Sequence, residues 1–329
     1  MKHLTIADVG ENGLLEIIRA QLPPPPSGFS APIHDVAHVP PPPTGCETII
    51  TADMLVSGVH FDPAVIPPYY SGWRAMAANL SDIAAAGGEA LAVIILLGLP
   101  PSTDVSYLTR LYRGMVGCLK ASSTKAAIAG GDVVRSAILT IAITVVGYAP
   151  SKRRMGRSGA QAGDMLVVSG WLGRAARGWQ LLQAHEGWMD REAARRFLSP
   201  MPRLALGREL AALGANAMTD TSDSLYEGIT NLASASGLGA EVWVDRLPLP
   251  GTFSRMMDFD QRYDLAWGGG EDYELLAAIP PTRLHDLSAL AKFVGIPLTV
   301  IGKFTAGAGV AILDANGKLL PPPRFFHHF

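Results

Sequence analysis

Hydrophobic positions along the chain alternate between short β-branched runs and longer segments with helical spacing. Thr48–Val56 and Leu139–Ala149 are apolar and β-branched, which favours strands, whereas Gly13–Gln21 carries its apolar residues on one side of a helix. For residues 1–150 the pattern predicts helices at Gly13–Gln21, Trp73–Ala86 and Val105–Ala121, and strands at Ile33–Val39, Thr48–Val56 (ending near Asp53), Leu91–Leu97, Ala126–Ala129 and Leu139–Ala149. This alternation predicts a sheet covered by helices, an α/β or α+β layer.

A polar, glycine-containing stretch at Ser151–Gly163 is the best candidate for a domain boundary. Beyond it the pattern predicts helices at Gly173–Ala184, Arg191–Phe197, Leu204–Leu213 and Ser224–Ser236, and strands at Met165–Ser169, Ala217–Thr219, Glu241–Val244, Tyr273–Ile279, Leu298–Phe304 and Val310–Leu313. A chain of 329 residues is long enough for two buried cores. We therefore expect two α/β domains, residues 1–150 and 151–329.

Composition and charge favour a globular protein that binds neither nucleic acid nor membrane. The chain is 48% hydrophobic and 17% charged, with a net charge of −2. The basic cluster Lys152–Arg154, with Arg157, is short and reads as a solvated loop holding one functional arginine. Cys46 and Cys118 have no metal-binding spacing and are expected to be reduced structural thiols. The longest apolar run, Ala90–Leu99, is too short to span a bilayer, so a cytoplasmic protein is expected.

Five short acidic motifs lie beside small or hydroxyl residues. They are Thr51-Ala52-Asp53, Asn79-Leu80-Ser81-Asp82, Gly130-Gly131-Asp132, Asp220-Thr221-Ser222-Asp223 and Gly268-Gly269-Gly270-Glu271-Asp272. Small neighbours let a carboxylate and the backbone approach a ligand closely. An aspartate in a glycine-rich turn can equally be a turn residue. Five such motifs in order favour a metal–nucleotide site, in which Mg²⁺ bridges carboxylates and phosphates.

Several signatures of nucleotide enzymes and hydrolases are absent. The sequence has no Gly-x-x-x-x-Gly-Lys-Ser/Thr loop, no Gly-x-Gly-x-x-Gly turn, no His-Arg-Asp loop, no Gly-x-Ser-x-Gly elbow and no His-Glu-x-x-His helix. Phosphoryl transfer depends mainly on positioning and charge neutralisation. Acidic motifs that hold several Mg²⁺ ions, together with a cation such as Arg157, would meet that requirement.

Taken together, the motifs carry a family resemblance. They read Thr-x-Asp…Gly-x-His-Phe, Asn-Leu-Ser-Asp-x-Ala-Ala, Gly-Gly-Asp, Arg-Ser-Gly-Ala-x-x-Gly-Asp, Pro-x-Pro-Arg, Asp-x-Ser-Asp and Gly-Gly-Glu-Asp-Tyr-Glu-Leu. This ordered set resembles the thiamine-monophosphate kinases, which belong to the superfamily of aminoimidazole ribonucleotide synthetase, selenophosphate synthetase and a hydrogenase maturation factor. The resemblance runs from Gly10-Glu11 to Phe329, nearly the whole chain.

The resemblance implies a two-domain α/β fold whose N-terminal domains pair across a homodimer, with ATP and Mg²⁺ bound in the clefts. It implies ATP-dependent phosphorylation of a small phosphomonoester, thiamine monophosphate. By motif match, the metal ligands would be Asp35, Thr51, Ala52, Asp53, Asp82, Asp132, Asp220 and Asp223. The ATP contacts would be Gly131, Asp132, Arg157 and Ser222, and the substrate contacts His60, Glu271 and Phe326. Asp132, Asp223 and Arg157 would act on the transferring phosphate.

Each of these assignments has a structural alternative. His60 could be an ordinary structural histidine, and Phe326 could serve C-terminal packing. Ser222 and Ser224 could simply cap the helix whose start they occupy, and Asp220 and Asp223 could share that role, because serine and aspartate favour helix N-termini. Arg157 could be a loop residue, although its planar donor fork suits phosphate.

Four departures from the family pattern leave the substrate open. The Gly-Asp-Asp near the N-terminus appears as Ile33-His34-Asp35, and the Thr-Asp pair becomes Ala52-Asp53. The Gly-Leu that follows the family's Asp-x-Ser-Asp appears as Ser224-Leu225, and an aromatic before the C-terminal motif is replaced by Pro322 or Pro323. An alternative is therefore another kinase or ATP-driven synthetase of the same superfamily, acting on another small phosphorylated or amino-bearing metabolite. A third possibility is a non-catalytic nucleotide-binding protein.

Overall fold

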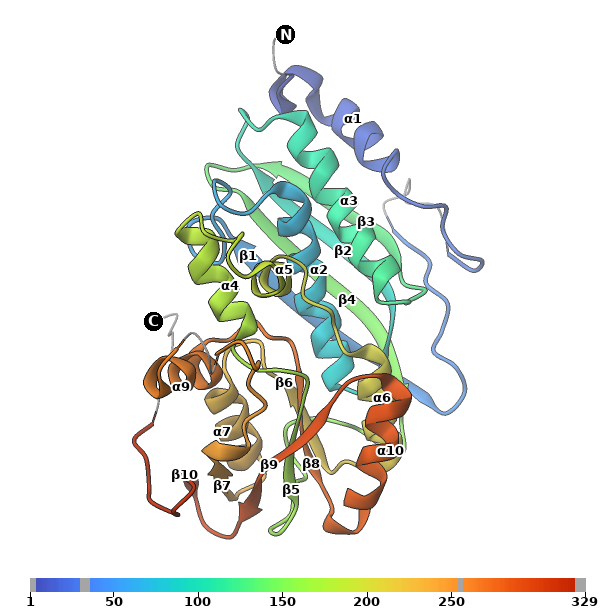
Figure 1. The fold of residues 1–329 in the computed structure, drawn as a ribbon. Coiled ribbons are helices and arrows are strands. Elements are labelled where there is room, and N and C mark those ends of the chain that lie inside the picture. Colours follow the sequence, from blue (N-terminus) through green and yellow to red (C-terminus); the bar gives the residue numbers. More distant parts are fainter. Residues whose placement is uncertain (1–3, 30–35, 254–256, 323–329) are drawn as a thin grey trace. The chain divides into compact units, whose positions relative to one another are not determined.

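The computed structural model describes residues 4–29, 36–253 and 257–322 (Figure 1). They divide into two compact units. Unit 1 comprises residues 1–83 and 89–152, and unit 2 comprises residues 84–88 and 153–329. The segment Ile33-His34, Asp35, Pro323 and Phe326 lie outside the described residues, so the predictions made for them stay predictions.

Unit 1 is built on a four-stranded sheet with helices on one side (Figure 1). The strands are β1 (Cys46–Val56), β2 (Glu89–Leu99), β3 (Ala127–Arg135) and β4 (Thr140–Pro150), in the order β1-β4-β2-β3. The helices are α1 (Ile6–Arg19), α2 (Pro68–Ala85) and α3 (Val105–Ala121). Only the β2–β3 pair is parallel, because α3 forms the crossover between these two strands.

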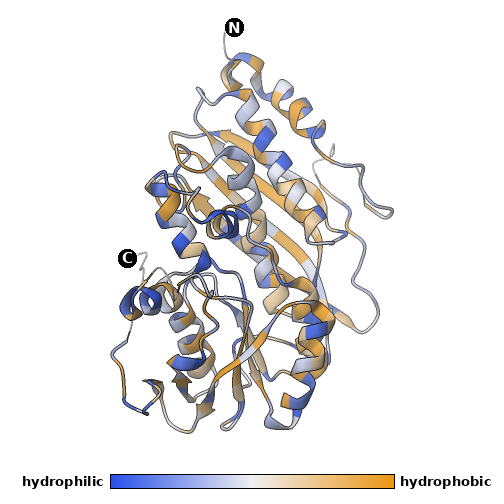
Figure 2. Ribbon diagram, in the orientation of Figure 1, coloured by the Kyte–Doolittle hydropathy of each residue, from blue (hydrophilic) through white to orange (hydrophobic). Residues whose placement is uncertain are grey.

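The two faces of this sheet differ in burial. Residues such as Val93, Ile95 and Ile143 are buried on the side of α2 and α3. Alternate residues point to the opposite face, where Ile50 is 69%, Met54 56% and Leu96 47% exposed. Figure 2 shows that these strands are mainly hydrophobic along their length. We call this second side, which carries Ile50, Met54, Ile94, Leu96 and Val134, the open face.

Unit 2 contains a six-stranded mixed sheet in the order β10-β7-β9-β5-β8-β6. Its strands are β5 (Met165–Ser169), β6 (Ala217–Asp220), β7 (Gly239–Trp243), β8 (Leu275–Ile279), β9 (Leu298–Thr305) and β10 (Gly309–Leu313). Its helices are α4 (Arg174–Gln183), α5 (Arg191–Leu198), α6 (Leu204–Leu213), α7 (Leu225–Ala235), α9 (Phe259–Gly268) and α10 (Leu284–Val294), with the 3₁₀ turns η1 (Val244–Arg246) and η2 (Pro281–Arg283).

Both faces of the central strands of unit 2 are buried. Leu276 on β8 belongs to a hydrophobic core shared with Ile229 on α7 and Trp267 on α9. The alternate residues Ala277 and Ile279 face the other way and are also fully buried. Figure 1 shows α6 and α10 on the side of the sheet away from α7 and α9. Unit 2 therefore has no counterpart of the open face among its described central strands.

Several sequence predictions were wrong in detail. Helix α1 begins at Ile6 rather than Gly13, and its backbone departs from helical geometry at Gly10, where φ is 65°. β1 does not end near Asp53 but continues to Val56, and β3 runs straight through the predicted Gly130–Asp132 turn. Both strands continue because a neighbouring strand supplies backbone hydrogen-bond partners over their whole length.

Other errors concern whole elements. The described part of the predicted strand Ile33–Val39, residues 36–39, forms no strand. Helices α9 and α10 were not predicted, because α9 carries few apolar residues on one side and α10 is only partly buried. Within the described residues, no helix is both long and apolar enough to cross a membrane.

Candidate functional site

In unit 1, the predicted metal ligands of β1 and α2 meet. The Thr51 hydroxyl donates a hydrogen bond of 2.5 Å to Oδ2 of Asp82. Asp53 lies two residues after Thr51, so its side chain is on the same, helix-covered face of the sheet. Ala52 points its methyl group to the opposite face, which leaves only its backbone for a ligand. Thr51, Asp53 and Asp82 thus form a group of oxygen donors, the ligand type that Mg²⁺ prefers.

Asp132 lies apart from this group within unit 1. It is on β3, and two strands separate β3 from β1. At a strand spacing of about 4.8 Å, the two edge strands are about 14 Å apart. Asp132 pairs with Leu96, which places its side chain on the open face, and its Oδ1 accepts the Val133 N–H at 2.8 Å. The preceding Gly131 passes so close to β2 that a Cβ there would lie 1.9 Å from the Ile95 carbonyl oxygen.

His60 is held in the turn that follows β1. The Val56 N–H donates to its Nδ1 at 3.1 Å, and the His60 N–H donates to the Val56 carbonyl at 2.9 Å. Because Nδ1 accepts a hydrogen bond, the neutral ring carries its proton on Nε2. His60 is therefore oriented as a hydrogen-bond donor through Nε2, a role compatible with a substrate contact.

In unit 2, the Asp220–Asp223 motif forms the end of β6 and the loop before α7. Asp220 is buried and accepts a hydrogen bond of 3.0 Å from the Ser222 hydroxyl, whereas Asp223 is exposed. Ser224 is the residue that caps α7, because its hydroxyl accepts the Glu227 N–H at 3.0 Å. The capping alternative is therefore confirmed for Ser224 and wrong for Ser222, Asp220 and Asp223.

The loop that carries Glu271 packs directly against this motif. The Glu271 N–H donates to the Ser222 carbonyl at 2.6 Å. At Gly270 a Cβ would lie 2.2 Å from the Asp223 carbonyl oxygen, so only glycine permits this approach. Two motifs that are almost 50 residues apart in the chain are thus brought side by side, and Glu271 lies next to Ser222 and Asp223.

The backbone of this second loop is strained. Glu271 has φ 62° and Tyr273 has φ 50°, in the left-handed region that disfavours residues with a Cβ. The cost is about 1–2 kcal/mol for each such residue. Such conformations persist only where surrounding contacts fix them, and they are concentrated at functional sites.

A buried charge network supplies those contacts. Glu274 is 1% exposed, and both of its oxygens accept hydrogen bonds from the Arg203 guanidinium, that from Nε at 2.8 Å. The Ser169 hydroxyl donates to Oε2 of Glu274 at 2.6 Å and accepts the Leu275 N–H at 2.9 Å. Burial, with the neighbouring Arg203, also lowers the pKa of Arg196.

Asp272, between the two strained residues, fixes the start of α4. Its carboxylate accepts the N–H groups of Gly173 at 2.6 Å and Ala175 at 3.0 Å, where the helix dipole favours an anion. Burial raises the pKa of Asp272 to about 7, while these two N–H groups act in the opposite direction. This network was not predicted. Arg203 and Glu274 stand in quoted motifs, but no local pattern pairs residues 71 positions apart.

Arg157 extends from an anchored loop. The Met218 N–H donates to the Gly156 carbonyl at 2.9 Å, which ties the loop to β6. Arg157 itself is exposed, and no hydrogen bond or ion pair engages its guanidinium within the described residues. A guanidinium in this setting can bind a phosphate.

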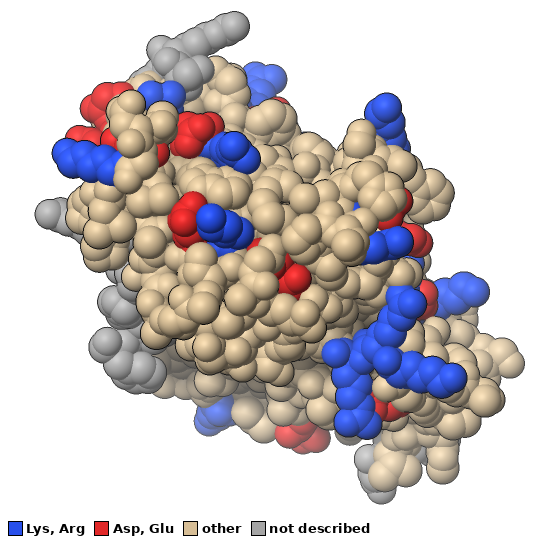
Figure 3. All heavy atoms as spheres, turned by 90° about the horizontal axis from the view of Figure 1, so that it is seen from below, with Lys and Arg blue, Asp and Glu red and all other residues tan. Residues whose placement is uncertain are grey.

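Charged side chains on the face drawn in Figure 3 are unevenly distributed. Several basic side chains gather at the lower right, and the other acidic and basic side chains of the described residues form small groups with uncharged surface between them. Across residues 4–29, 36–253 and 257–322, no three His, Cys, Asp or Glu side chains converge as a metal cluster on their own. The acidic residues instead form separate groups of two or three oxygen donors, which suits Mg²⁺ that is also bound by phosphates and water.

Comparison with known proteins identifies the family. Residues 34–149 match the N-terminal domain of AIR synthase related proteins, and residues 161–314 match their C-terminal domain. The chain is 33% identical to the thiamine-monophosphate kinase of Synechococcus elongatus, over 100% of this chain and 99% of that protein. The chain belongs to the thiamine-monophosphate kinase family.

Solved structures of the family have the same fold. The thiamine-monophosphate kinase of Stenotrophomonas maltophilia K279a superimposes with a TM-score of 0.83 at 31% identity, covering 93% of this chain and 96% of that one. AaThiL complexed with AMPPCP and TMP superimposes with a TM-score of 0.75 at 29% identity, covering 98% of each chain. The likeness to this kinase family therefore extends over both units.

Proposed function

We propose that this protein transfers the terminal phosphate of ATP to thiamine monophosphate, which yields thiamine diphosphate and ADP. The observation that carries the proposal is the full-length similarity to a thiamine-monophosphate kinase, 33% identical over the whole chain. A related protein of the same fold, AaThiL, has been solved in complex with AMPPCP, an analogue of ATP, and with TMP.

The chemistry requires positioning rather than a nucleophilic side chain. A phosphate oxygen of thiamine monophosphate forms a bond to the γ-phosphorus, the bond from that phosphorus to the β,γ-bridging oxygen breaks, and ADP leaves. The acceptor phosphate is already ionised at pH 7, since its second pKa is about 6 as for other phosphate monoesters. No strong general base is therefore needed, and no phosphoenzyme forms in this scheme.

The oxygen donors of the two units fit Mg²⁺. Thr51, Asp53 and Asp82 would hold metal in unit 1, and Asp220 and Asp223 in unit 2, because carboxylate and hydroxyl oxygens are hard ligands. The site assigned to Asp35 and Asp132 follows from the motif match. When bound, Mg²⁺ would neutralise charge on the two anionic reactants and on the transferring group.

Other residues of this chain would bind and orient the reactants. Arg157 would contact ATP phosphates, with Ser222 and the backbone of Gly131. His60, which presents Nε2–H, and Glu271, whose loop is fixed against Ser222, would contact the thiamine end. A strained but well-supported loop suits this role, because catalysis benefits from groups that need no reorganisation.

The open face of unit 1 supports a homodimer. Its apolar residues, including Ile50, Met54 and Leu96, are exposed in the single chain, and a contiguous apolar patch of this kind marks an interaction surface. A second copy of the chain would cover this face. Asp132 shares the face with Leu96 and would then lie in or beside the interface.

An assay with purified protein tests the function. We expect Mg-ATP and thiamine monophosphate to give ADP and thiamine diphosphate, identified by product mass. Thiamine serves as the matched control, because it lacks the acceptor phosphate. A panel of other phosphomonoesters and amino-bearing metabolites covers the alternative substrates of the superfamily. Turnover of a panel compound, with thiamine monophosphate inert, would replace the proposal by that alternative.

A further inference from the structure

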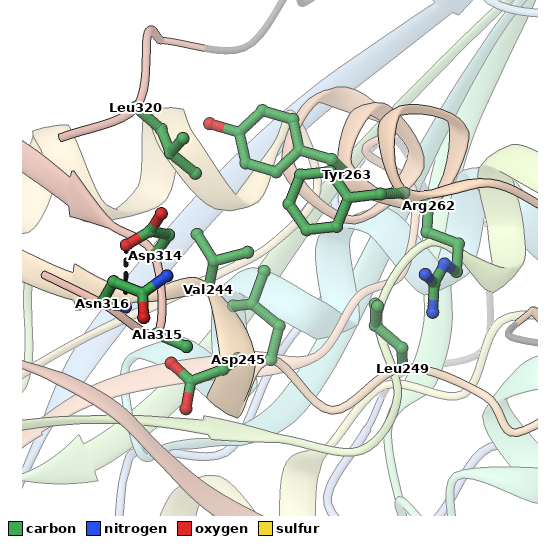
Figure 4. Close-up of a pocket in the computed structure, with 11 residues that line it drawn as sticks. Val244, Asp245, Leu249, Arg262, Tyr263, Asp314, Ala315, Asn316 and Leu320 are labelled. Atoms are coloured by element: carbon green, nitrogen blue, oxygen red, sulfur yellow. Dashed lines mark hydrogen bonds between the residues drawn. The ribbon is translucent and has the colours of Figure 1, made fainter. Parts of the chain in front are cut away.

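Unit 2 contains a pocket of about 410 Å³ beside α9 (Figure 4). Its walls are η1 with the loop that follows, the first half of α9, and the turn after β10 together with Leu320. None of the described residues assigned to metal, ATP or substrate lines it. Its size lies within the range of roughly 300–1,000 Å³ that is typical of small-molecule sites.

The middle of the pocket is apolar and aromatic. Phe259 and Tyr263, one turn apart on α9, have ring centroids 5.8 Å apart and planes inclined by only 20°. The Tyr263 hydroxyl donates to the Pro321 carbonyl at 2.9 Å, which fixes that ring beside Leu320. Leu249 also lines the pocket. Flat aromatic rings are bound favourably between such side chains.

The two ends of the pocket carry opposite charges. Figure 4 shows the carboxylates of Asp245 and Asp314 toward one end and the guanidinium of Arg262 toward the other. Asp314 is held in place, because one of its oxygens accepts the N–H groups of Asn316 and Lys318, both at 2.9 Å. Arg262 is fixed through Nε, which donates to the Asp258 carbonyl at 3.1 Å.

These charges do not neutralise one another inside the protein. In the described part of the chain, neither Asp245 nor Arg262 forms an ion pair. The attraction between opposite charges is strongest when they are in direct contact, so charges that only stabilised the fold would be expected to pair. In this pocket, apolar side chains separate Arg262 from the two carboxylates. Separated charges across an apolar space complement a ligand that carries both charges at its two ends.

We propose that this pocket is a second binding site, which takes a small, elongated zwitterion with a flat ring between its charged groups. The ligand's cationic group lies at Asp245 and Asp314, its ring packs on Phe259 and Tyr263, and its anionic group is bound by Arg262. A ligand with only one charge leaves the opposite end of the pocket uncompensated, so it binds more weakly. The proposal does not depend on the kinase activity.

The probe for this site is 4-(aminomethyl)benzoate, which has an ammonium group and a carboxylate at opposite ends of one ring. Benzylamine and 4-methylbenzoate are matched controls that each lack one charge. We expect calorimetry to show the zwitterion binding at least about tenfold more tightly than either control, which is the range of a charged hydrogen bond. Equal binding of all three compounds, or no binding of the zwitterion, would overturn the proposal.

Two variants locate the bound probe. In Arg262→Gln, the zwitterion should bind no more tightly than benzylamine. In Asp245→Asn, the zwitterion should exceed 4-methylbenzoate in affinity by less than it does in the native protein. Asp245 is exposed and Arg262 is only half-buried, so the fold should tolerate both changes, and circular dichroism checks this. Glu271→Gln is the control and should leave probe binding unchanged. Loss of probe binding in Glu271→Gln, with Arg262→Gln unaffected, would place the probe in the proposed active site and refute the second site.

Discussion

The site residues of unit 1 and unit 2 are supported in opposite ways. In unit 2, the loop of Glu271 is strained but is fixed by a buried ion pair, a serine hydroxyl and the backbone of the Asp220–Asp223 motif. In unit 1, Thr51 donates a hydrogen bond to Asp82. Asp132 lies on the open face, and within the described residues its carboxylate accepts a hydrogen bond from the N–H of its neighbour Val133.

This difference suggests that substitutions in the two units will have different effects. The geometry of the unit 2 loops is determined by the unit itself, so changes there should affect folding as well as binding. According to the proposed function, the geometry of the unit 1 acids would be completed by groups from outside, namely metal, phosphate and a second copy of the chain. Changes there should affect activity or association and leave the fold nearly intact. Five measurements test this contrast.

Removing the buried carboxylate of unit 2 should have the largest effect. Glu274→Ala leaves the Arg203 guanidinium, which is 10% exposed, without its partner. We expect the free energy of unfolding to fall by about 3–5 kcal/mol, as for other broken buried ion pairs. Urea denaturation measures this, with Glu16→Ala on the exposed side of α1 as a control expected within about 0.5 kcal/mol. A loss below about 1 kcal/mol would mean that the network does not hold the loop.

Removing a carboxylate from unit 1 should instead affect turnover. Asp82→Asn or Asp132→Asn removes a proposed Mg²⁺ ligand, so phosphorylation of thiamine monophosphate should fall by about 100-fold or more. The free energy of unfolding should change by less than about 1 kcal/mol, because neither side chain is buried. Glu16→Gln is the matched control. Near-normal turnover of both variants, or activity that survives EDTA, would refute the metal assignment.

A charge on the open face should dissociate the proposed dimer. Leu96→Lys replaces a leucine whose burial in an interface would contribute about 2 kcal/mol for each copy. Light scattering should show a dimer for the native protein and a monomer for the variant at micromolar concentration. Phe293→Lys on α10, where the side chain is 78% exposed, is the control and should leave the mass unchanged. A fully active native monomer would contradict the prediction.

Replacing Arg157 should separate nucleotide binding from folding. An arginine–phosphate contact is worth about 1.5–3 kcal/mol. Arg157→Ala should therefore weaken ATP binding by about 10- to 100-fold and leave thiamine monophosphate binding nearly unchanged. Calorimetry with each ligand measures both, and Lys152→Ala provides an exposed basic control nearby. If acceptor binding collapses and ATP binding is kept, the two ends of the site have been assigned the wrong way round.

Asp272 should make the stability of the protein depend on pH. Burial raises the pKa of its carboxyl in the folded protein to about 7, above the ordinary value of 3.8. Between these two pKa values the folded state keeps a proton that the unfolded chain has lost. The free energy of unfolding should therefore fall as pH rises through this window, by up to about 1.4 kcal/mol per pH unit.

Denaturation of the native protein and of Asp272→Asn at several pH values measures this contribution. The variant should be less stable than the native protein at low pH, because an amide replaces one of the two oxygens that accept N–H groups from α4. Because this amide does not titrate, the stability of the variant should depend less on pH between about 4 and 7. If the free energy of unfolding changes equally with pH in the two proteins, Asp272 does not titrate in this range.

The sequence located most of the elements but fewer of their ends. The strongly apolar strand β4 was predicted nearly in full, and the middle of β2 was predicted as Leu91–Leu97, because periodicity reports burial directly. β3 was cut short at Gly130, since two consecutive glycines normally indicate a turn. The pairing of β3 with β2 overrides that local preference, and this pairing is not visible in a single segment.

The motifs indicated which residues belong to the candidate site but not how these residues are arranged in space. The acidic motifs by themselves indicated a metal–nucleotide site, because Mg²⁺ binds carboxylates together with phosphates, and the resemblance of the whole ordered set of motifs indicated the kinase family. The motifs did not show how the acids lie relative to one another, and the strand order places Asp53 and Asp132 on opposite edges of a sheet.

By itself, the sequence indicated the class of fold, the family and the oxygen ligands of the proposed metal sites, since these depend on residue identity and local spacing. Only the tertiary structure decided which distant residues meet: Thr51 with Asp82, Ser222 with Glu271, and Arg203 with Glu274. The physical reason is that such contacts join segments 31 to 71 residues apart, and their geometry follows from strand order, register and helix packing. The opposed charges of the second pocket have the same origin, because Asp245, Arg262 and Asp314 converge only when η1, α9 and the turn after β10 pack together.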